Sequence, residues 1–129
     1  MTLYLDASAA AKLLVDEVES DALVAFLDET VDVQELFSSA VLETELRRLA
    51  VRLELDQSAV TDLLARVDLV DPPRSVFHEA GLLPGRHLRT LDALHLATAL
   101  RVGADTVVAY DARLLAAART LGMSVQSPS

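Results

Sequence analysis

The amino-acid sequence predicts an α/β protein built on a parallel sheet, and two observations support this fold class. Short apolar segments typical of buried strands alternate along the chain with longer segments whose apolar residues recur at helical spacing. Strands that alternate with helices form βαβ units, in which a right-handed crossover joins two parallel strands. The chain has 129 residues and shows no repeat or linker, so we expect one domain over residues 1–129.

The N-terminal half contains the first two predicted strands. A strand over residues 2–5 runs straight into Asp6, and its apolar character predicts a central position in the sheet. The next expected elements are helices over 8–15 and 19–29, a strand over 35–38, a long helix to about residue 55, and a helix to residue 66 that starts at Asp56 or Ser58. Ser38 or Ser39 is expected to cap the long helix, whose apolar stripe is predicted to be Leu42, Leu46, Leu49 and Leu53.

The C-terminal half continues the alternation. We expect a strand over 67–70 closed by Pro72 and Pro73, a helix over 75–83, a loop over 84–87, a helix over 91–102, a strand over 106–109, a helix over 113–121 and a strand over 123–126. The helix over 91–102 is opened by Thr90 and ended by Gly103. It is apolar on nearly all sides, which predicts a central, buried helix.

Composition narrows the class of function. The net charge is −9, which argues against non-specific binding of nucleic acid, because such binding depends on neutralising phosphates. It leaves room for an enzyme that recruits divalent cations, or for a basic partner. No cysteine is present, so disulfides and thiolate metal sites are excluded. The sequence has no apolar run long enough to span a membrane and no signal peptide, so we expect a cytoplasmic protein.

Three aspartates lie where a strand passes into a helix or in the first turn of a helix: Asp6, Asp92 and Asp111. Each has an ordinary structural role, since Asp6 and Asp111 can cap helices and Asp92 can favour a helix dipole. Glu43 borders the apolar stripe of the long helix and can equally pair with Arg47, four residues on. Most other acids, including the run from Asp16 to Asp32, fit a solvated surface.

The topology gives these carboxylates a second interpretation. Parallel strands that end at Asp6 and Asp111 place both side chains at one edge of the sheet, where open α/β proteins bind ligands. Like charges packed in a partly dry site are unfavourable unless a cation is bound or protons are taken up. Mg²⁺ and Mn²⁺ prefer oxygen ligands and can turn bound water into a nucleophile. The residues therefore indicate an acidic cation site without identifying its substrate.

Four short motifs, in order and at family spacing, resemble the PIN-domain ribonucleases of the VapC toxin type. They run from Leu3 to Ala9 with Lys12 beyond, from Ser39 to Leu46, from Arg89 to Ala97, and from Val108 to Leu114. Each motif is short, but together they cover nearly the whole chain. One departure is Ala109, which stands where the family often has threonine or serine two residues before the last aspartate.

The resemblance implies a three-layer α/β/α sandwich with about five parallel strands in the order 3-2-1-4-5. It implies Mg²⁺, or Mn²⁺ in its place, at an acidic site formed by Asp6, Glu43, Asp92 and Asp111. Within that set it makes Asp6, Asp92 and Asp111 the metal ligands, Glu43 a residue that binds through water or orients it, and Ser8 a supporting hydroxyl. It also implies endonucleolytic cleavage of tRNA or ribosomal RNA, a VapB-type antitoxin partner in a type II toxin–antitoxin system, and a homodimer.

Several basic residues have two interpretations. Arg86 and Arg89 flank the loop before Asp92 and are candidates for binding substrate phosphates, as is Lys12, against the alternative of solvated surface charges. His95, one turn past Asp92, is expected to be a hydrogen-bonded core histidine, with a role near the site as the alternative.

Other functions remain open at this stage. A Mg²⁺-dependent phosphatase of the haloacid-dehalogenase type needs a second aspartate where this chain has Ser8, and a lysine late in the chain, where none follows Lys12. A response-regulator receiver needs an acidic pair after the first strand and the same late lysine. A catalytically silent PIN fold that serves only as a binding module is the third alternative, and the four acids argue against it.

Overall fold

The computed structural model describes residues 2–30 and 35–129, and these residues form five strands and seven helices. The strands are β1 (Thr2–Leu5), β2 (Glu35–Ser39), β3 (Asp68–Val70), β4 (Thr106–Val108) and β5 (Ser124–Gln126). All strand pairs are parallel, and the order across the sheet is β3-β2-β1-β4-β5. The α/β class and the predicted strand order are therefore confirmed.

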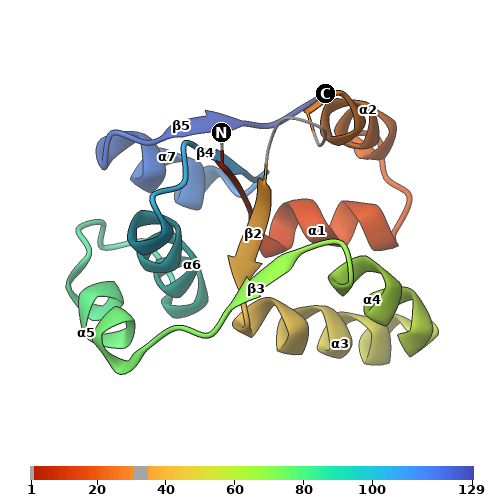
Figure 1. The fold of residues 1–129 in the computed structure, drawn as a ribbon, viewed down its shortest axis with the longest axis horizontal. Helices are drawn as coiled ribbons and strands as arrows, with labels where there is room; N and C mark the ends of the chain where they lie inside the picture. The colour runs from red at the N-terminus through yellow and green to blue at the C-terminus, as the bar shows by residue number, and fades with distance from the viewer. Residues whose placement is uncertain (1, 31–34) are drawn as a thin grey trace.

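Helices cover both faces of the sheet (Figure 1). One layer consists of α1 (Ala7–Leu14), α2 (Ser20–Thr30), α3 (Val41–Leu53) and α4 (Gln57–Leu64). The other consists of α5 (Arg74–Leu82), α6 (Thr90–Val102) and α7 (Ala112–Thr120). The ends of these helices and strands lie within about two residues of the predicted ones, because cap, glycine and proline signals mark most of them.

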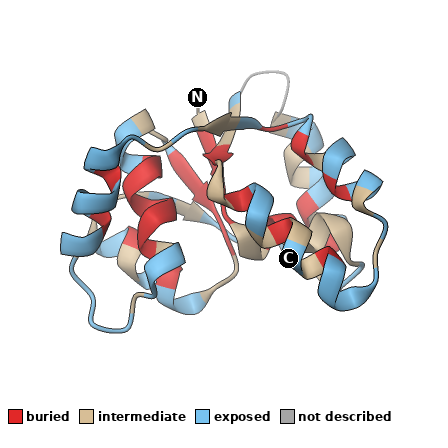
Figure 2. Cartoon of the chain, turned by 90° about the horizontal axis from the view of Figure 1, so that it is seen from below, coloured by how far each residue is buried: buried red, intermediate tan, exposed pale blue. Residues whose placement is uncertain are grey.

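The central strand β1 explains the layered core. Leu3 and Leu5 pack in the cluster formed with α1 to α4, whereas Tyr4 packs in the cluster formed with α6 and α7. This alternation follows from the two-residue period of a strand. All three side chains are at most 2% exposed, as expected for a parallel strand covered on both faces. In Figure 2 the buried colour is concentrated on the central strands and on the sides of the helices that face the sheet.

Helix α6 is central, as predicted. Its residues Ala93 to Ala99 are all buried, so the middle two turns have no solvent-facing side. The ends differ from the sequence-based expectation, because Leu91 and Leu100 are 46% and 42% exposed. Packing against the sheet on one side and α5 on the other encloses only the middle of the helix.

Helix α3 corrects two predictions. Its buried residues are Leu42, Leu46 and Ala50, while Leu53 is 48% exposed because it lies in the last turn of the helix. The N-cap is Ala40, which offers no side chain for capping. Ser38 and Ser39 are instead the last two residues of β2, and the Ser38 hydroxyl donates to the Leu5 carbonyl at 2.7 Å.

Two further expectations concern the acidic surface run and membrane-spanning helices. Asp32, part of the predicted acidic surface run, lies outside the described residues. Among the residues that the structure does describe, no helix combines the length and the apolar character that a membrane span requires.

Candidate active site

The ends of β1 and β4 bring Asp6 and Asp111 to the same edge of the sheet. Leu5 pairs with Val108, and the Asp6 amide donates to the Val108 carbonyl at 3.0 Å. Each aspartate then caps the helix that follows its strand, as the structural interpretation of the sequence proposed. The Oδ1 atom of Asp111 accepts from the amides of Arg113 and Leu114 at 2.9 and 3.0 Å.

Asp6 uses only one of its two carboxylate oxygens. Its Oδ2 accepts from the Ser8 amide at 3.1 Å and from the Ser8 hydroxyl at 2.6 Å. Its Oδ1 is buried and has no hydrogen-bond partner among the described residues, in a side chain that is 2% exposed. A buried carboxylate oxygen without a partner carries a substantial desolvation cost, so this atom is suited to serve as a ligand to a cation.

Ser8 links the two strand ends. Its Oγ donates to Asp6 and accepts from the amides of Tyr110 and Asp111 at 2.9 and 3.3 Å. The hydroxyl therefore fixes the Asp6 carboxylate against the turn between β4 and α7. This is the structural basis for the supporting role expected of Ser8.

Asp92 lies in the first turn of α6, half-buried beside the other acids. Burial, followed by the charges of Asp6 and Asp111, raises the pKa of Asp92 to about 6. The charge of Glu45 acts in the same direction, and that of His95 opposes it. Asp92 therefore lies within reach of the charges of Asp6 and Asp111, and of a fourth carboxylate that the sequence analysis did not select.

That fourth carboxylate is Glu45 and not Glu43. The Glu43 side chain is 48% exposed and accepts from Arg47 Nε at 2.8 Å, the ion pair foreseen as its structural role. Arg47 also donates to Gln57 of α4, so this flank of α3 faces α4. Glu45 lies on the opposite flank, with its side chain 19% exposed and directed at the acid cluster.

His95 is fully buried between Tyr4 and Glu45. Its Nδ1 is 2.8 Å from the Tyr4 hydroxyl, and its Nε2 is 2.5 Å from Glu45 Oε1. Burial lowers the pKa of His95, but the hydrogen bond to Glu45 and the charges of Asp6, Glu45 and Asp92 outweigh burial, so the pKa is raised. Burial raises the pKa of Tyr4, so its hydroxyl stays protonated. His95 is thus a hydrogen-bonded core histidine that also touches the site.

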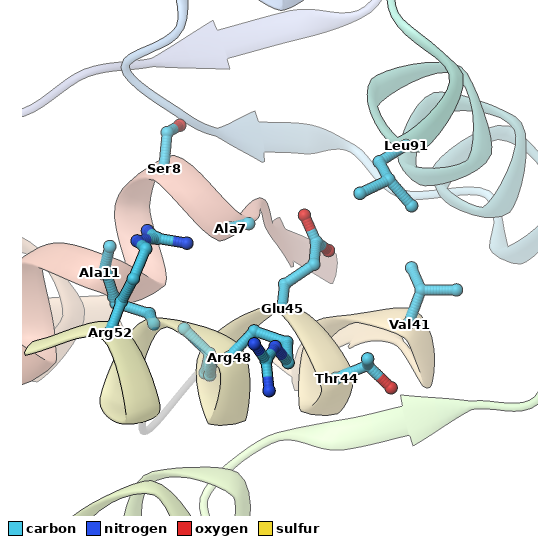
Figure 3. A pocket seen from close by; sticks show the side chains of 11 residues that line it. Ala7, Ser8, Ala11, Val41, Thr44, Glu45, Arg48, Arg52 and Leu91 are labelled. Carbon is cyan, nitrogen blue, oxygen red and sulfur yellow. The ribbon is translucent and has the colours of Figure 1, made fainter. Parts of the chain in front are cut away.

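A cavity of about 600 Å³ opens beside the acids, between α1 and α3. Its walls include Glu45, Arg48 and Arg52 of α3, Ser8 and Ala11 of α1, and Leu91 of α6. Figure 3 shows Glu45 directed from α3 toward the end of β1, and Arg52 extending toward α1 near Ala11. Neither Arg48 nor Arg52 has an ion pair within residues 2–30 and 35–129.

The basic residues selected from the sequence are either paired with acids or lie away from this cavity. Lys12 pairs with Glu17 and Glu19 at 2.6 and 3.0 Å and lies over the Tyr110 ring, so its ammonium is already occupied. Arg86 and Arg89 are exposed in and after the loop that precedes α6, and neither lines the cavity between α1 and α3. Ala109 is fully buried in the apolar cluster with Tyr4.

The acids fit a hard divalent cation by their chemistry. The candidate ligands are all carboxylates, one buried oxygen of Asp6 is unpartnered among the described residues, and burial together with neighbouring negative charges raises the pKa of Asp92. Across the described ranges, however, no three acidic or histidine side chains converge closely enough to hold an ion as they stand. Helix capping and the contact with His95 hold three of the carboxylates in their present orientations.

Comparisons with known proteins place this fold and site in one family. The profile of the PIN domain matches residues 3–120. Ribonuclease VapC46 of Mycobacterium tuberculosis is 44% identical over 130 residues, covering 98% of each chain. Ribonuclease VapC35 of the same organism is 39% identical over 132 residues, covering 98% of this chain and 96% of the relative. The chain belongs to the PIN-domain family and, within it, to the VapC ribonucleases.

Solved structures of this group share the fold. A chain of the VapBC2 complex from Rickettsia felis, crystallised with a DNA fragment from its promoter, superimposes with a TM-score of 0.77 over 100% of both chains at 16% identity. VapC20 of Mycobacterium tuberculosis, described as a sarcin–ricin loop cleaving toxin, superimposes with a TM-score of 0.69, covering 89% of this chain and 94% of that one at 17% identity. At such identities the agreement concerns the fold.

Proposed function

We propose that this protein is the toxin of a type II toxin–antitoxin pair and cleaves RNA endonucleolytically with Mg²⁺ or Mn²⁺. The observation that carries the proposal is the unpartnered, buried Oδ1 of Asp6, beside an Asp92 whose pKa is raised to about 6. A divalent cation at this edge would satisfy the first group and reverse the pKa shift of the second. The VapC ribonucleases at 44% and 39% identity support RNA as the substrate.

The residues divide into two sets by role. Asp6 and Asp92 are the candidates for direct metal ligands, and Asp111 binds directly or through water. Glu45 takes the place that the sequence analysis assigned to Glu43, because it is the α3 carboxylate that adjoins the cluster. When bound, the cation would polarise the phosphodiester and activate a water molecule. Ser8 holds the Asp6 carboxylate in place through its hydroxyl.

Arg48 and Arg52 are proposed to bind RNA phosphates on the approach to the acids. Both lie on the wall of the cavity that Glu45 also lines, and neither is paired with a carboxylate of the described chain. A guanidinium suits bidentate contacts with phosphate. Their position also explains how a protein with a net charge of −9 presents local positive charge to a polyanion.

The partners follow from the same family. We propose a VapB-type antitoxin, which is supported by the fold shared with a chain of the Rickettsia felis VapBC2 complex. A homodimer remains a prediction from the resemblance, and a cytoplasmic location remains a prediction from the sequence. Which structured RNA is cut, whether tRNA or ribosomal RNA, is determined by mapping the cleaved ends.

The first test is cleavage of total cellular RNA by the purified protein in Mg²⁺, in Mn²⁺ and in EDTA. The matched variants are Asp6→Asn and Asp92→Asn, which keep the shape of the side chains and remove one negative charge each. Discrete fragments that require both the metal and the two aspartates are the expected result. Full activity in a folded Asp6→Asn variant contradicts the site. If the native chain cleaves no RNA with either metal but still binds its antitoxin, the result favours a binding module.

The second test concerns the arginines. Arg48→Ala and Arg52→Ala are each expected to raise KM for RNA and to lower the slope of log affinity against log salt by about 0.7, the value for one phosphate contact on a single strand. Arg119→Ala on the exposed side of α7 is the matched control. Unchanged salt slopes in both cavity variants contradict this assignment.

A further inference from the structure

A buried chain of hydrogen bonds connects the sheet to the acid cluster through His95. Tyr4 comes from β1, His95 from α6 and Glu45 from α3, positions that are 91 and 50 residues apart along the sequence. Tyr4 and His95 are 0% and 1% exposed. Three elements therefore meet through two hydrogen bonds in the interior of the protein.

The direction of one hydrogen bond follows from the chemistry of the partners. An ionised carboxylate only accepts, so the hydrogen between His95 and Glu45 belongs to Nε2 of the ring. In the neutral ring Nδ1 accepts from Tyr4, and in the charged ring it donates to the Tyr4 oxygen. In both forms Nε2–H is directed at Glu45, so the neutral and the charged ring make the same contact with this carboxylate.

The same nitrogen lies near two carboxylates and hydrogen-bonds to one of them. Nε2 is 2.5 Å from Glu45 Oε1 but 4.0 Å from Asp6 Oδ1, which is beyond hydrogen-bond distance. His95 thus restrains Glu45, while Asp6 Oδ1 is left without a partner among the described residues.

We propose that His95 is a positioning residue, which holds Glu45 in the orientation required at the cation site and leaves Asp6 Oδ1 open to the ion. This inference rests on the proposed function. Groups that orient a metal ligand from behind typically contribute about 10- to 100-fold to metal affinity or activity. Tyr4 in turn fixes the ring of His95, so β1 sets both the position of Asp6 and, through the histidine, that of Glu45.

Two substitutions separate this role from that of a core residue. In His95→Gln the amide nitrogen takes the place of Nε2 and still donates to Glu45. In His95→Asn the amide takes the place of Nδ1 and reaches only Tyr4. Calorimetric titration of the full chain with Mn²⁺ is expected to show affinity within about threefold of native for His95→Gln and about tenfold weaker for His95→Asn. The value of kcat for RNA cleavage falls in the same order, with KM for RNA nearly constant.

A double-mutant cycle adds a second readout. In a Glu45→Gln background, His95→Asn is expected to cause no additional loss of Mn²⁺ affinity, because the residue it positions is already altered. Equal losses in both backgrounds contradict the proposal, since His95 would then act independently of Glu45. Where His95→Asn does not fold, His95→Met takes its place, because it keeps an apolar side chain of similar size and removes the hydrogen bond to Glu45.

The outcomes distinguish the two levels of inference. Absence of Mn²⁺ binding by the native chain overturns the proposed function, and the role of His95 with it. Binding by the native chain that is matched by His95→Asn or His95→Met overturns the positioning role alone, and leaves His95 as a core histidine. Weak binding by the variants with restored binding by His95→Gln supports both.

Discussion

Two groups of carboxylates in this protein have opposite surroundings. Between α1 and α2, Glu17 and Glu19 share the ammonium of Lys12 at 2.6 and 3.0 Å. At the edge of the sheet, Asp6, Asp92, Asp111 and Glu45 gather without a lysine or arginine paired to any of them in the described ranges. Within the described part of the chain, the groups that bind these carboxylates are His95, backbone amides and the Ser8 hydroxyl.

The pKa values show what this difference means. The hydrogen bond with Lys12 lowers the pKa of Glu19, as an adjacent cation should. Burial and the charges of Asp6 and Asp111 raise the pKa of Asp92 to about 6. The first group is paired with a cation of the chain itself, and the second is where we propose that a cation from solution binds. Three experiments test this difference between the two groups of carboxylates.

The largest expected effect compares two glutamates on one helix. Glu45→Gln is expected to slow RNA cleavage roughly 100-fold, at the upper end of the range for a group that holds or orients a metal ligand. Glu43→Gln should change the rate less than about threefold, because its carboxylate pairs with Arg47 in an exposed contact worth a few tenths of a kcal/mol. The measurement is kcat/KM on one defined RNA.

Glu43→Gln serves as the matched control, since both variants neutralise a glutamate of α3. A rate for Glu43→Gln that falls as far as that of Glu45→Gln would return Glu43 to the site.

The next effect is on stability without metal. The pKa of Asp92 is about 6 in the fold against an ordinary value of 3.8, so the folded protein holds the proton more tightly than the unfolded chain does. This contribution to stability is complete below about pH 4 and is lost as pH rises through about 6. Asp92→Asn should therefore raise the melting temperature of the metal-free protein at neutral pH, by on the order of 2 to 4 °C after allowing for solvent screening.

Thermal melts in EDTA between pH 4 and pH 7.5 test this sign. Near pH 4 the native protein and Asp92→Asn should have nearly the same melting temperature. Asp16→Asn, at an exposed position, should leave the melting temperature unchanged at every pH tested. Adding Mn²⁺ should stabilise the native protein more than Asp92→Asn. A melting temperature that is lowered at neutral pH by Asp92→Asn would show that the site is not strained by like charges.

The smallest effect concerns Lys12. Because its ammonium is held by Glu17 and Glu19, Lys12→Ala should leave RNA cleavage within about twofold of native while lowering stability by about 0.2–1 kcal/mol per lost ion pair. The loss should shrink at high salt, which screens such pairs. Arg101→Ala, which breaks the exposed pair with Glu79, is the control. A tenfold loss of cleavage confined to Lys12→Ala would restore Lys12 as a phosphate contact.

The sequence sufficed for most of the fold because its signals are local. Alternation of strands and helices, with caps and prolines between them, predicted each element, and the family resemblance supplied the strand order. Asp6 and Asp111 were predictable for the same reason, since the end of a strand is visible in the sequence and its neighbours follow from the topology.

The flank of α3 that faces the site was not predictable in this way. Glu43 and Glu45 both adjoin the buried residues Leu42 and Leu46, so the apolar stripe does not choose between them. The choice depends on α1 packing on one side of α3 and α4 on the other. One available signal is that Glu45, Leu49 and Arg52 recur at spacings of four and three, which places an acid, an apolar residue and a base on one flank. The partners of His95, 50 and 91 residues away, have no such local signal.

The Ser8 hydroxyl also sets a condition on when the site exists. It is bonded at once to Asp6, two residues before it, and to the amides of Tyr110 and Asp111, more than 100 residues later. Chains emerge from the ribosome N-terminal end first, so a growing chain carries Asp6 long before it carries the strand that completes its surroundings. The contacts that join the ends of β1 and β4 through Ser8 can therefore form only after Asp111 has been synthesised.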